Sequence, residues 1–183
     1  MRGFPFATSI ACLTAVIGFA TAPSSRAATA SGTSISTGAE CQLSIPTTDT
    51  QLRPRAIGAR NESTTTSSFV ICPMQVSPTF TEDAMNSVAM ALYSLDGQAR
   101  DVSCTAVTGW KGSSKLKYST KTISVDSTAT VDYGDLIFWY SEDFGGTPGT
   151  PIVGSLVFSV TCTLPPQTAI SFIQNVYSYN VGA

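Results

Sequence analysis

The sequence predicts an all-β protein: a single antiparallel β-sandwich of jelly-roll or immunoglobulin-like type, with eight or nine strands and two disulfides. Three observations support this fold class. Short apolar segments alternate with period two, turn signals separate them about every ten residues, and four cysteines follow an apolar leader. No stretch shows the spacing of a convincing amphipathic helix, and no internal repeat is present.

Residues 1–27 have the features of a secretory signal peptide. Arg2 supplies an early positive charge, residues 4–22 are largely apolar, and small residues follow. The small-x-small rule predicts cleavage after Ala27 or Ala30. The apolar run is short for a bilayer span and is broken by Thr, Ser and Gly. We therefore expect a secreted or periplasmic protein whose mature chain has no membrane span.

Composition excludes several classes of function. Without Arg2 and Arg26, eight Lys and Arg stand against twelve Asp and Glu, which gives a net charge of −4 and argues against nucleic-acid binding. The chain has no histidine. That excludes Ser-His-Asp and Cys-His catalysis and the usual zinc ligands, whereas chemistry that needs only carboxylates, or Ser with Lys, remains open.

Four cysteines remain after Cys12 is removed with the leader, and an even number in an exported chain predicts two disulfides. Strand alternation places Cys162 on the same face as Leu156, Phe158 and Val160, so we interpret it as a core staple and not a nucleophile. Four cysteines allow three pairings, and sequence does not choose between them. We favour Cys41–Cys72, which would tie the N-terminal segment to an early strand, and Cys104–Cys162, which would link two core strands.

The order of elements follows from breakers and alternation. Residues 28–40 are small and polar and are expected to be flexible, and residues 41–183 form the sandwich domain. Asp96-Gly97 predicts a hairpin, a helical turn is expected within 79–87, and a shift of apolar phase near Gln174-Asn175 predicts a bulge. The expected strands lie at 55–60, 69–72, 88–92, 100–107, 115–121, 128–132, 136–140, 156–162 and 169–181.

The order of these landmarks resembles a loosely defined group of small secreted bacterial hypothetical proteins with four cysteines and a β-sandwich fold. The resemblance covers most of the mature chain and implies a disulfide-bonded sandwich of the bacterial cell envelope, with no assigned activity. The matching pieces are Cys41 and residues 69–73, 102–104, 162–166 and 176–179.

An acidic and aromatic segment at 131–144 supplies the main candidate site residues. Oxygen ligands of the kind that calcium prefers are present in it, and flat aromatic rings suit sugars. The alternative is a core strand with acidic turns at both ends. The candidate calcium ligands are Asp132, Asp135, Glu142 and Asp143. The candidate sugar-binding residues are Tyr133, Trp139 and Tyr140 of this segment and Trp110 outside it.

Two further features have a structural and a functional interpretation. The lysines at 111, 115, 117 and 121 would either attract an anionic polymer or protect an edge strand from aggregation. Asn61-Glu62-Ser63 is a glycosylation sequon, which matters mainly in a eukaryotic secretory pathway.

We expect a non-enzymatic binding or structural module without a catalytic site. Its most concrete form binds cell-surface or environmental polysaccharide, with no cofactor unless calcium binds. One alternative is a pilus- or filament-like assembly subunit that donates its N-terminal strand to a neighbour. The other is a histidine-free hydrolase that uses two carboxylates, or Ser113 with Lys115.

Overall fold

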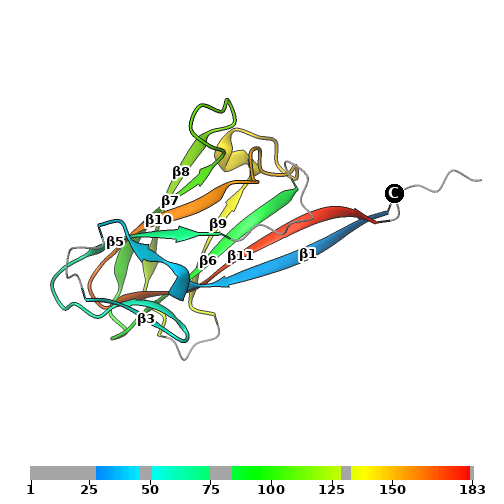
Figure 1. Cartoon of the computed structure of the whole chain (residues 1–183). Coiled ribbons are helices and arrows are strands. Elements are labelled where there is room, and N and C mark those ends of the chain that lie inside the picture. The colour runs from blue at the N-terminus through cyan, green and yellow to red at the C-terminus, as the bar shows by residue number, and fades with distance from the viewer. Residues whose placement is uncertain (1–27, 46–50, 75–83, 129–132, 182–183) are drawn as a thin grey trace, which may run out of the picture.

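The computed structural model describes residues 28–45, 51–74, 84–128 and 133–181. Within these ranges the chain forms eleven strands, two short 3-10 helices and no α-helix. The strands make two antiparallel sheets that face each other as a sandwich (Figure 1). The all-β prediction and the two sheets are confirmed, but the strand count exceeds eight or nine because the N-terminal third contributes more strands than predicted.

The six-stranded sheet has the order β3-β4-β11-β6-β9, and β1 pairs with β11 beside β4. Its strands are β1 (Ala28–Thr37), β3 (Leu52–Arg55), β4 (Gly58–Asn61), β6 (Met85–Ser94), β9 (Asp135–Tyr140) and β11 (Thr168–Val181).

The five-stranded sheet has the order β2-β5-β10-β7-β8. Its strands are β2 (Gln42–Leu43), β5 (Ser68–Pro73), β7 (Arg100–Thr108), β8 (Lys117–Val125) and β10 (Phe158–Leu164), and the 3-10 helices are η1 (Gly38–Glu40) and η2 (Ser141–Phe144).

The hydrophobic core lies between the two sheets and is built by alternation. Every second residue of β7 and β10 is buried, as the period-two pattern predicts. Leu156 is an exception, because β10 begins only at Phe158 and Leu156 lies in a turn where its side chain stays partly exposed. Gly154 makes that turn with φ +75°, a conformation that favours glycine.

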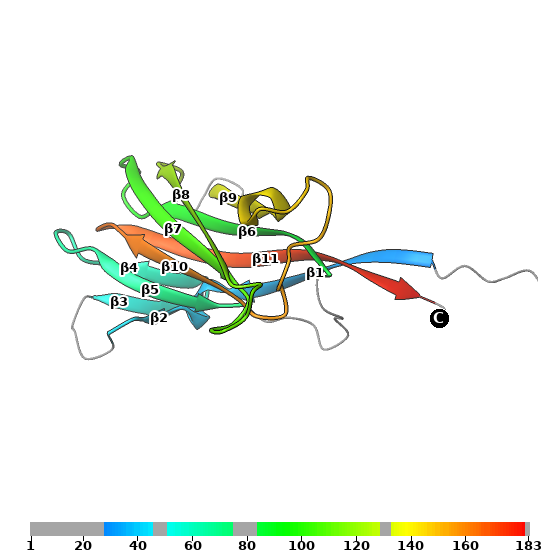
Figure 2. The same cartoon turned by 90° about the horizontal axis from the view of Figure 1, so that it is seen from above.

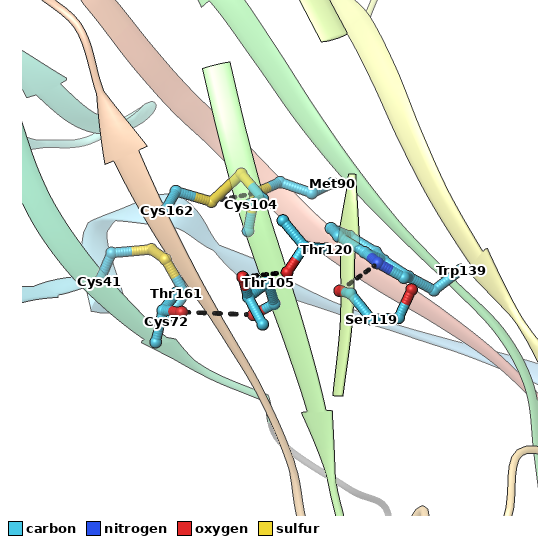
Figure 3. The surroundings of a disulfide bond; sticks show 10 residues. All are labelled: Cys41, Cys72, Met90, Cys104, Thr105, Ser119, Thr120, Trp139, Thr161 and Cys162. Carbon is cyan, nitrogen blue, oxygen red and sulfur yellow. Dashed lines mark hydrogen bonds between the residues drawn. A yellow bond between two sulfur atoms is a disulfide. The ribbon is translucent and has the colours of Figure 1, made fainter. Parts of the chain in front are cut away.

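Both predicted disulfides are confirmed. Cys41 is bonded to Cys72, and Cys104 is bonded to Cys162. Cys104 and Cys162 lie directly opposite each other on β7 and β10, so this bridge reinforces two neighbouring strands within one sheet. The thioether sulfur of Met90, on the facing sheet, lies 3.5 Å from Cys162 Sγ (Figure 3). Disulfide sulfurs carry no hydrogen, so this is a packing contact through which the bridge meets the opposite sheet.

The hairpin predicted at Asp96-Gly97 is wrong. The turn exists, but β6 belongs to the six-stranded sheet and β7 to the five-stranded sheet, so the chain crosses the sandwich here. The turn closes on Asp96, whose carboxylate accepts hydrogen bonds from the Gln98 amide (3.0 Å) and from both terminal nitrogens of Arg100 (2.6 and 2.7 Å). These bonds stabilise the turn itself and do not require the flanking strands to pair.

Residues 28–40 are ordered, which corrects the expected flexible segment. All ten residues of β1 lie in register with β11, from Ala28 opposite Val181 to Thr37 opposite Phe172. Among the β1 side chains only that of Ser36 is fully buried. Backbone hydrogen bonds to β11 therefore order this segment. The sequence did not predict the strand because it has almost no large apolar side chains. Figure 2 shows β1 and the end of β11 projecting from the body as a two-stranded ribbon.

Three smaller predictions also need revision. The helical turn expected at 79–87 is not found in its described part, because β6 already begins at Met85, and residues 79–83 lie outside the described ranges. The strand expected at 128–132 lies outside them except for Thr128. The bulge expected near Gln174-Asn175 lies one residue later, as a register shift between Val176 and Tyr177. A second register shift, between Ile170 and Phe172, was not predicted.

Removal of the Cys104–Cys162 bridge by Cys104→Ala with Cys162→Ala should lower the free energy of unfolding by about 4 kcal/mol, from the loop-entropy estimate. Chemical denaturation of the oxidised protein measures this loss. Cys41→Ala with Cys72→Ala is the matched control, with a similar expected loss because its loop is only moderately shorter. A loss below about 1 kcal/mol in both variants would contradict the entropic role.

The Asp96 turn predicts a pH dependence. Hydrogen bonds from Arg100, and then from the Gln98 amide, hold the pKa of the Asp96 carboxyl well below its ordinary value. The carboxylate therefore stabilises the fold above the unfolded-state pKa of about 4, and this contribution is lost as pH falls further. Asp96→Asn should be less stable than the parent at pH 7 in low salt, and the gap should shrink below about pH 4. Denaturation at pH 7 and in acid measures it; a gap that does not change with pH would contradict this role.

Candidate ligand-binding face

The outer face of the six-stranded sheet carries a group of aromatic side chains. In β9, Ile137 and Trp139 are buried, whereas Phe138 and Tyr140 point outward because successive residues of a strand alternate faces. Phe172 of β11 lies on the same side, directly opposite Ala91 of β6. We call the outer surface formed by Ile35, Tyr133, Phe138, Tyr140, Phe172 and Gln174 the aromatic face.

Rings on this face are accessible and ordered relative to one another. The exposed fractions are 38% for Phe138, 42% for Tyr140 and 70% for Tyr133. The Phe138 and Tyr140 rings are nearly parallel, with centroids 6.1 Å apart and planes 10° apart. Tyr133 meets Phe172 edge to face at 6.3 Å. These contacts restrict the rings before any ligand arrives, which lowers the entropic cost of binding.

Two adjoining pockets hollow the aromatic face. The larger has a volume of about 600 Å³ and the smaller about 270 Å³. Tyr133, Phe172 and Gln174 line both pockets, so the two form one continuous depression. Ile35, Ile57 and Tyr93 also line the larger pocket, and Ala89, Leu136 and Phe138 the smaller.

The depression is lined by uncharged groups. Among the described residues that line it, none is Asp, Glu, Lys or Arg. The polar side-chain groups there are the hydroxyls of Tyr93, Tyr133 and Ser171 and the amide of Gln174. Within the described residues, no hydrogen bond engages the Gln174 side chain, which keeps its donors and acceptor for a ligand. Apolar walls with a few polar groups fit a neutral ligand.

Arg60 contacts Tyr93, one of the residues that line the larger pocket. Tyr93 is almost fully buried, and its hydroxyl accepts a hydrogen bond from Arg60 Nε at 3.1 Å. The Arg60 guanidinium also lies 5.9 Å from the Tyr93 ring centroid. The contact between Arg60 and Tyr93 holds this wall of the pocket in place.

Trp139 was predicted as a sugar-binding residue, and the structure corrects this. Its side chain is fully buried in the core. The indole Nε1 donates a hydrogen bond to the Ser119 carbonyl of β8 at 3.2 Å (Figure 3). Trp139 therefore links the edges of the two sheets and is not accessible to a ligand.

Trp110 is exposed but lies elsewhere. It occupies the turn between β7 and β8 of the five-stranded sheet, with 47% of its surface accessible. It lines neither pocket of the aromatic face. Of the four residues predicted to bind sugar, Tyr133 and Tyr140 are brought to this face.

The predicted calcium ligands are separated. Asp135 begins β9, whereas Glu142 and Asp143 lie in η2 beyond its other end. Asp135 already accepts bonds from the backbone amides of Asp126 and Ser127. Asp132 lies outside the described residues, and among those described no three acidic or thiol side chains cluster as metal ligands do.

Asp143 instead contributes to closing the sandwich edge. Its carboxylate accepts a hydrogen bond from the Tyr140 amide at 2.8 Å and forms an ion pair with Lys121 Nζ at 2.7 Å. The same Lys121 nitrogen donates to the Phe138 carbonyl at 2.7 Å, on the edge of β9.

The four lysines at 111, 115, 117 and 121 therefore form only in part a cationic surface. Lys117 and Lys121 lie on β8, which is an edge of the five-stranded sheet, and Lys111 and Lys115 lie in the turn before it. Lys121 is committed to β9 and Asp143. This arrangement favours protection of an edge strand over attraction of an anionic polymer.

The asparagine of the glycosylation sequon is buried and hydrogen-bonded. Asn61 is fully buried, and its Nδ2 donates to the carbonyls of Thr66, Leu164 and Pro165 at 2.8 to 3.1 Å. The side-chain nitrogen that a glycan would modify is thus inside the fold.

Sequence reasoning missed Ile35, Phe138, Phe172 and Gln174. Alternation in residues 136–140 already placed Phe138 on the face of Tyr140, so that signal was available. Phe172 could not be placed in the same way, because the register shift after Ile170 reverses the phase of β11.

Comparison with family models, with curated protein sequences and with solved structures finds no match. In the described part of the chain, no helix has the length and apolar character needed to cross a membrane. The two disulfides indicate an oxidising, extracytoplasmic environment.

Trp139→Phe should cost about 2–3 kcal/mol of stability, because it removes a buried hydrogen bond and leaves a cavity. Trp110→Phe, the matched control at an exposed position, should change stability by less than about 0.5 kcal/mol. Thermal or denaturant unfolding of both variants measures this difference. Equal losses would mean that Trp139 does not act as a core link.

Proposed function

We propose that this protein is an exported, non-enzymatic binding module that recognises a neutral polysaccharide through its aromatic face. The observation that carries the proposal is the pair of parallel rings, Phe138 and Tyr140, beside an uncharged depression lined by Tyr133 and Phe172. Sugar rings have apolar faces that pack on aromatic rings and hydroxyls that bind amides and phenols. Gln174, Ser171 and the Tyr133 hydroxyl supply such polar partners at the floor and rim.

The location of this module is part of the proposal. The leader at 1–27 would direct export, and the two disulfides suit the periplasm or the medium. A neutral polysaccharide also suits a protein of net negative charge, because the rest of the protein would repel an acidic polymer.

The hydrolase alternative has less support. Glycoside hydrolysis with carboxylates needs two of them flanking one bond. Among the described lining residues, the two pockets of the aromatic face contain no carboxylate, and a third pocket beside η2 contains only that of Glu142. Ser113 accepts a hydrogen bond from the Lys115 backbone amide, so a turn accounts for their proximity.

The strand-donating subunit is also less well supported. A donated strand leaves its own fold incomplete, whereas β1 pairs with β11 of the same chain along all ten residues.

The proposal predicts which aromatic residues matter. Phe138→Ala, Tyr140→Ala and Tyr133→Ala should each weaken binding to a neutral polysaccharide roughly 2- to 12-fold, the range expected for one aromatic contact. A glycan and cell-wall polysaccharide array identifies the polymer, and titration calorimetry measures each variant.

Trp110→Ala is the matched control, because it removes an exposed ring from the other sheet. It should leave affinity unchanged, as should removal of calcium with a chelator. Loss of binding on Trp110→Ala, with retained binding in the three face variants, would refute the assignment of the site. Absence of saturable binding across the array would refute the proposed ligand class.

A further inference from the structure

The sheets expose several strand edges, and most of them carry a device that blocks pairing with another chain. An unpaired edge offers backbone N–H and C=O groups to any extended strand, so natural proteins protect it with charge, proline, shortness or a cover. Edge strand β3 has the sequence Leu-Arg-Pro-Arg, and β2 is only two residues long. Edges β8 and β9 lie side by side and are closed by the Trp139–Ser119 and Lys121–Phe138 bonds.

The outer edge of β1 has no such device. It is ten residues long and contains only Ala, Thr, Ser, Gly and Ile. Within the described residues no other strand pairs with this edge. Its partner β11 is also free of Asp, Glu, Lys and Arg, so the whole ribbon is uncharged in an otherwise acidic protein.

The direction of the open hydrogen-bonding groups follows from one bond. The Ser178 amide donates to the Ala84 carbonyl at 2.9 Å, away from β1. Backbone groups of successive strand residues point to opposite sides, so Tyr177 and Tyr179 face β1 and bond with Gly32 and Ala30 opposite them. On β1, the residues that alternate with Ala30 and Gly32 direct their N–H and C=O groups outward. They are Thr29, Ser31, Thr33 and Ile35.

We infer that the outer edge of β1 is a self-association surface, and that a second copy of this chain pairs its own β1 with it in antiparallel orientation. Two uncharged strands place no like charges opposite each other, whereas the unbalanced charge of an acidic or basic partner would find no complement here. The closed, twofold arrangement uses the same edge on both copies.

A register centred on Gly32 suits this pairing. It places Thr29 opposite Ile35 and Ser31 opposite Thr33 of the partner, so all four outward residues bond. It also aligns Gly32 with its own copy. The Tyr177 ring lies over Gly32, where a Cβ would come within 2.6 Å of it, so the two tyrosines would approach each other across the two glycines.

The shape of the molecule permits this arrangement. The ribbon projects from the body beyond the end of β6 (Figures 1 and 2). In an antiparallel pair the two ribbons run in opposite directions, so the two bodies lie at opposite ends of a shared four-stranded ribbon.

The test is the oligomeric state of the exported protein with both disulfides formed. Sedimentation at about 10 μM to about 1 mM covers the range of weak specific association. The parent should show a monomer–dimer equilibrium. Thr33→Pro removes an outward N–H, which an edge strand tolerates, and should weaken association roughly 10- to 100-fold. Thr33→Val keeps the N–H and should dimerise as the parent does.

A second variant and a second measurement keep the inference testable if Thr33→Pro misfolds. Ser31→Lys adds a charge to the edge without changing the backbone and should also reduce dimerisation. Amide exchange by NMR should show Ala30 and Gly32 protected at all concentrations, and Ser31 and Thr33 protected only when the dimer forms. A parent that stays monomeric throughout, or a dimer that persists in both Thr33→Pro and Ser31→Lys, overturns the inference.

Discussion

The fold depends on the hydrogen-bonding capacity of β11. This one strand pairs with β6 along one side and with β4 and then β1 along the other. It therefore joins the N-terminal strand, the central strand β6 and the β3–β4 hairpin into one sheet. A backbone group of β11 that is buried without a partner costs free energy, and β1 supplies partners along ten residues. The length of β11 therefore sets how much of the N-terminal segment becomes ordered. The aromatic face exists because β11 and β9 flank β6 and present Phe172 and Phe138 on the same side.

Side-chain alternation carried most of what could be predicted from sequence. It placed Cys104 and Cys162 in the core, and it predicted most of the strands that line the core. It failed where order comes from the backbone. The side chains of β1 gave no signal, because small polar residues form an edge strand only when a long partner such as β11 is available. The Asp96-Gly97 turn showed where the chain reverses but not which sheet receives it, because local turn chemistry is the same in a hairpin and in a crossing connection.

The candidate site shows how closely function depends on strand phase. Trp139 and Tyr140 are neighbours, yet one is enclosed between the sheets and the other faces solvent. Both residues were predicted to bind sugar, whereas the Trp139 indole holds β9 against β8. The same junction commits Lys121 and Asp143, so charges that suggested a metal site or an anion site are used to close the sandwich. The polar chemistry of this region is thus mainly structural, and the proposed binding function rests on the uncharged aromatic face.

The buried amide of Asn61 has a consequence for where this protein can be made. Its side-chain nitrogen joins three carbonyls from two distant segments, which anchors the loop after β4 to the end of β10. Oligosaccharide transfer in a eukaryotic secretory pathway acts on accessible, unfolded Asn-x-Ser chains. A glycan added to Asn61 there would occupy the position of these hydrogen bonds and prevent the loop from docking. Chains that carry this glycan would be marked for quality control in yeast or animal cells, unless Ser63 were first replaced.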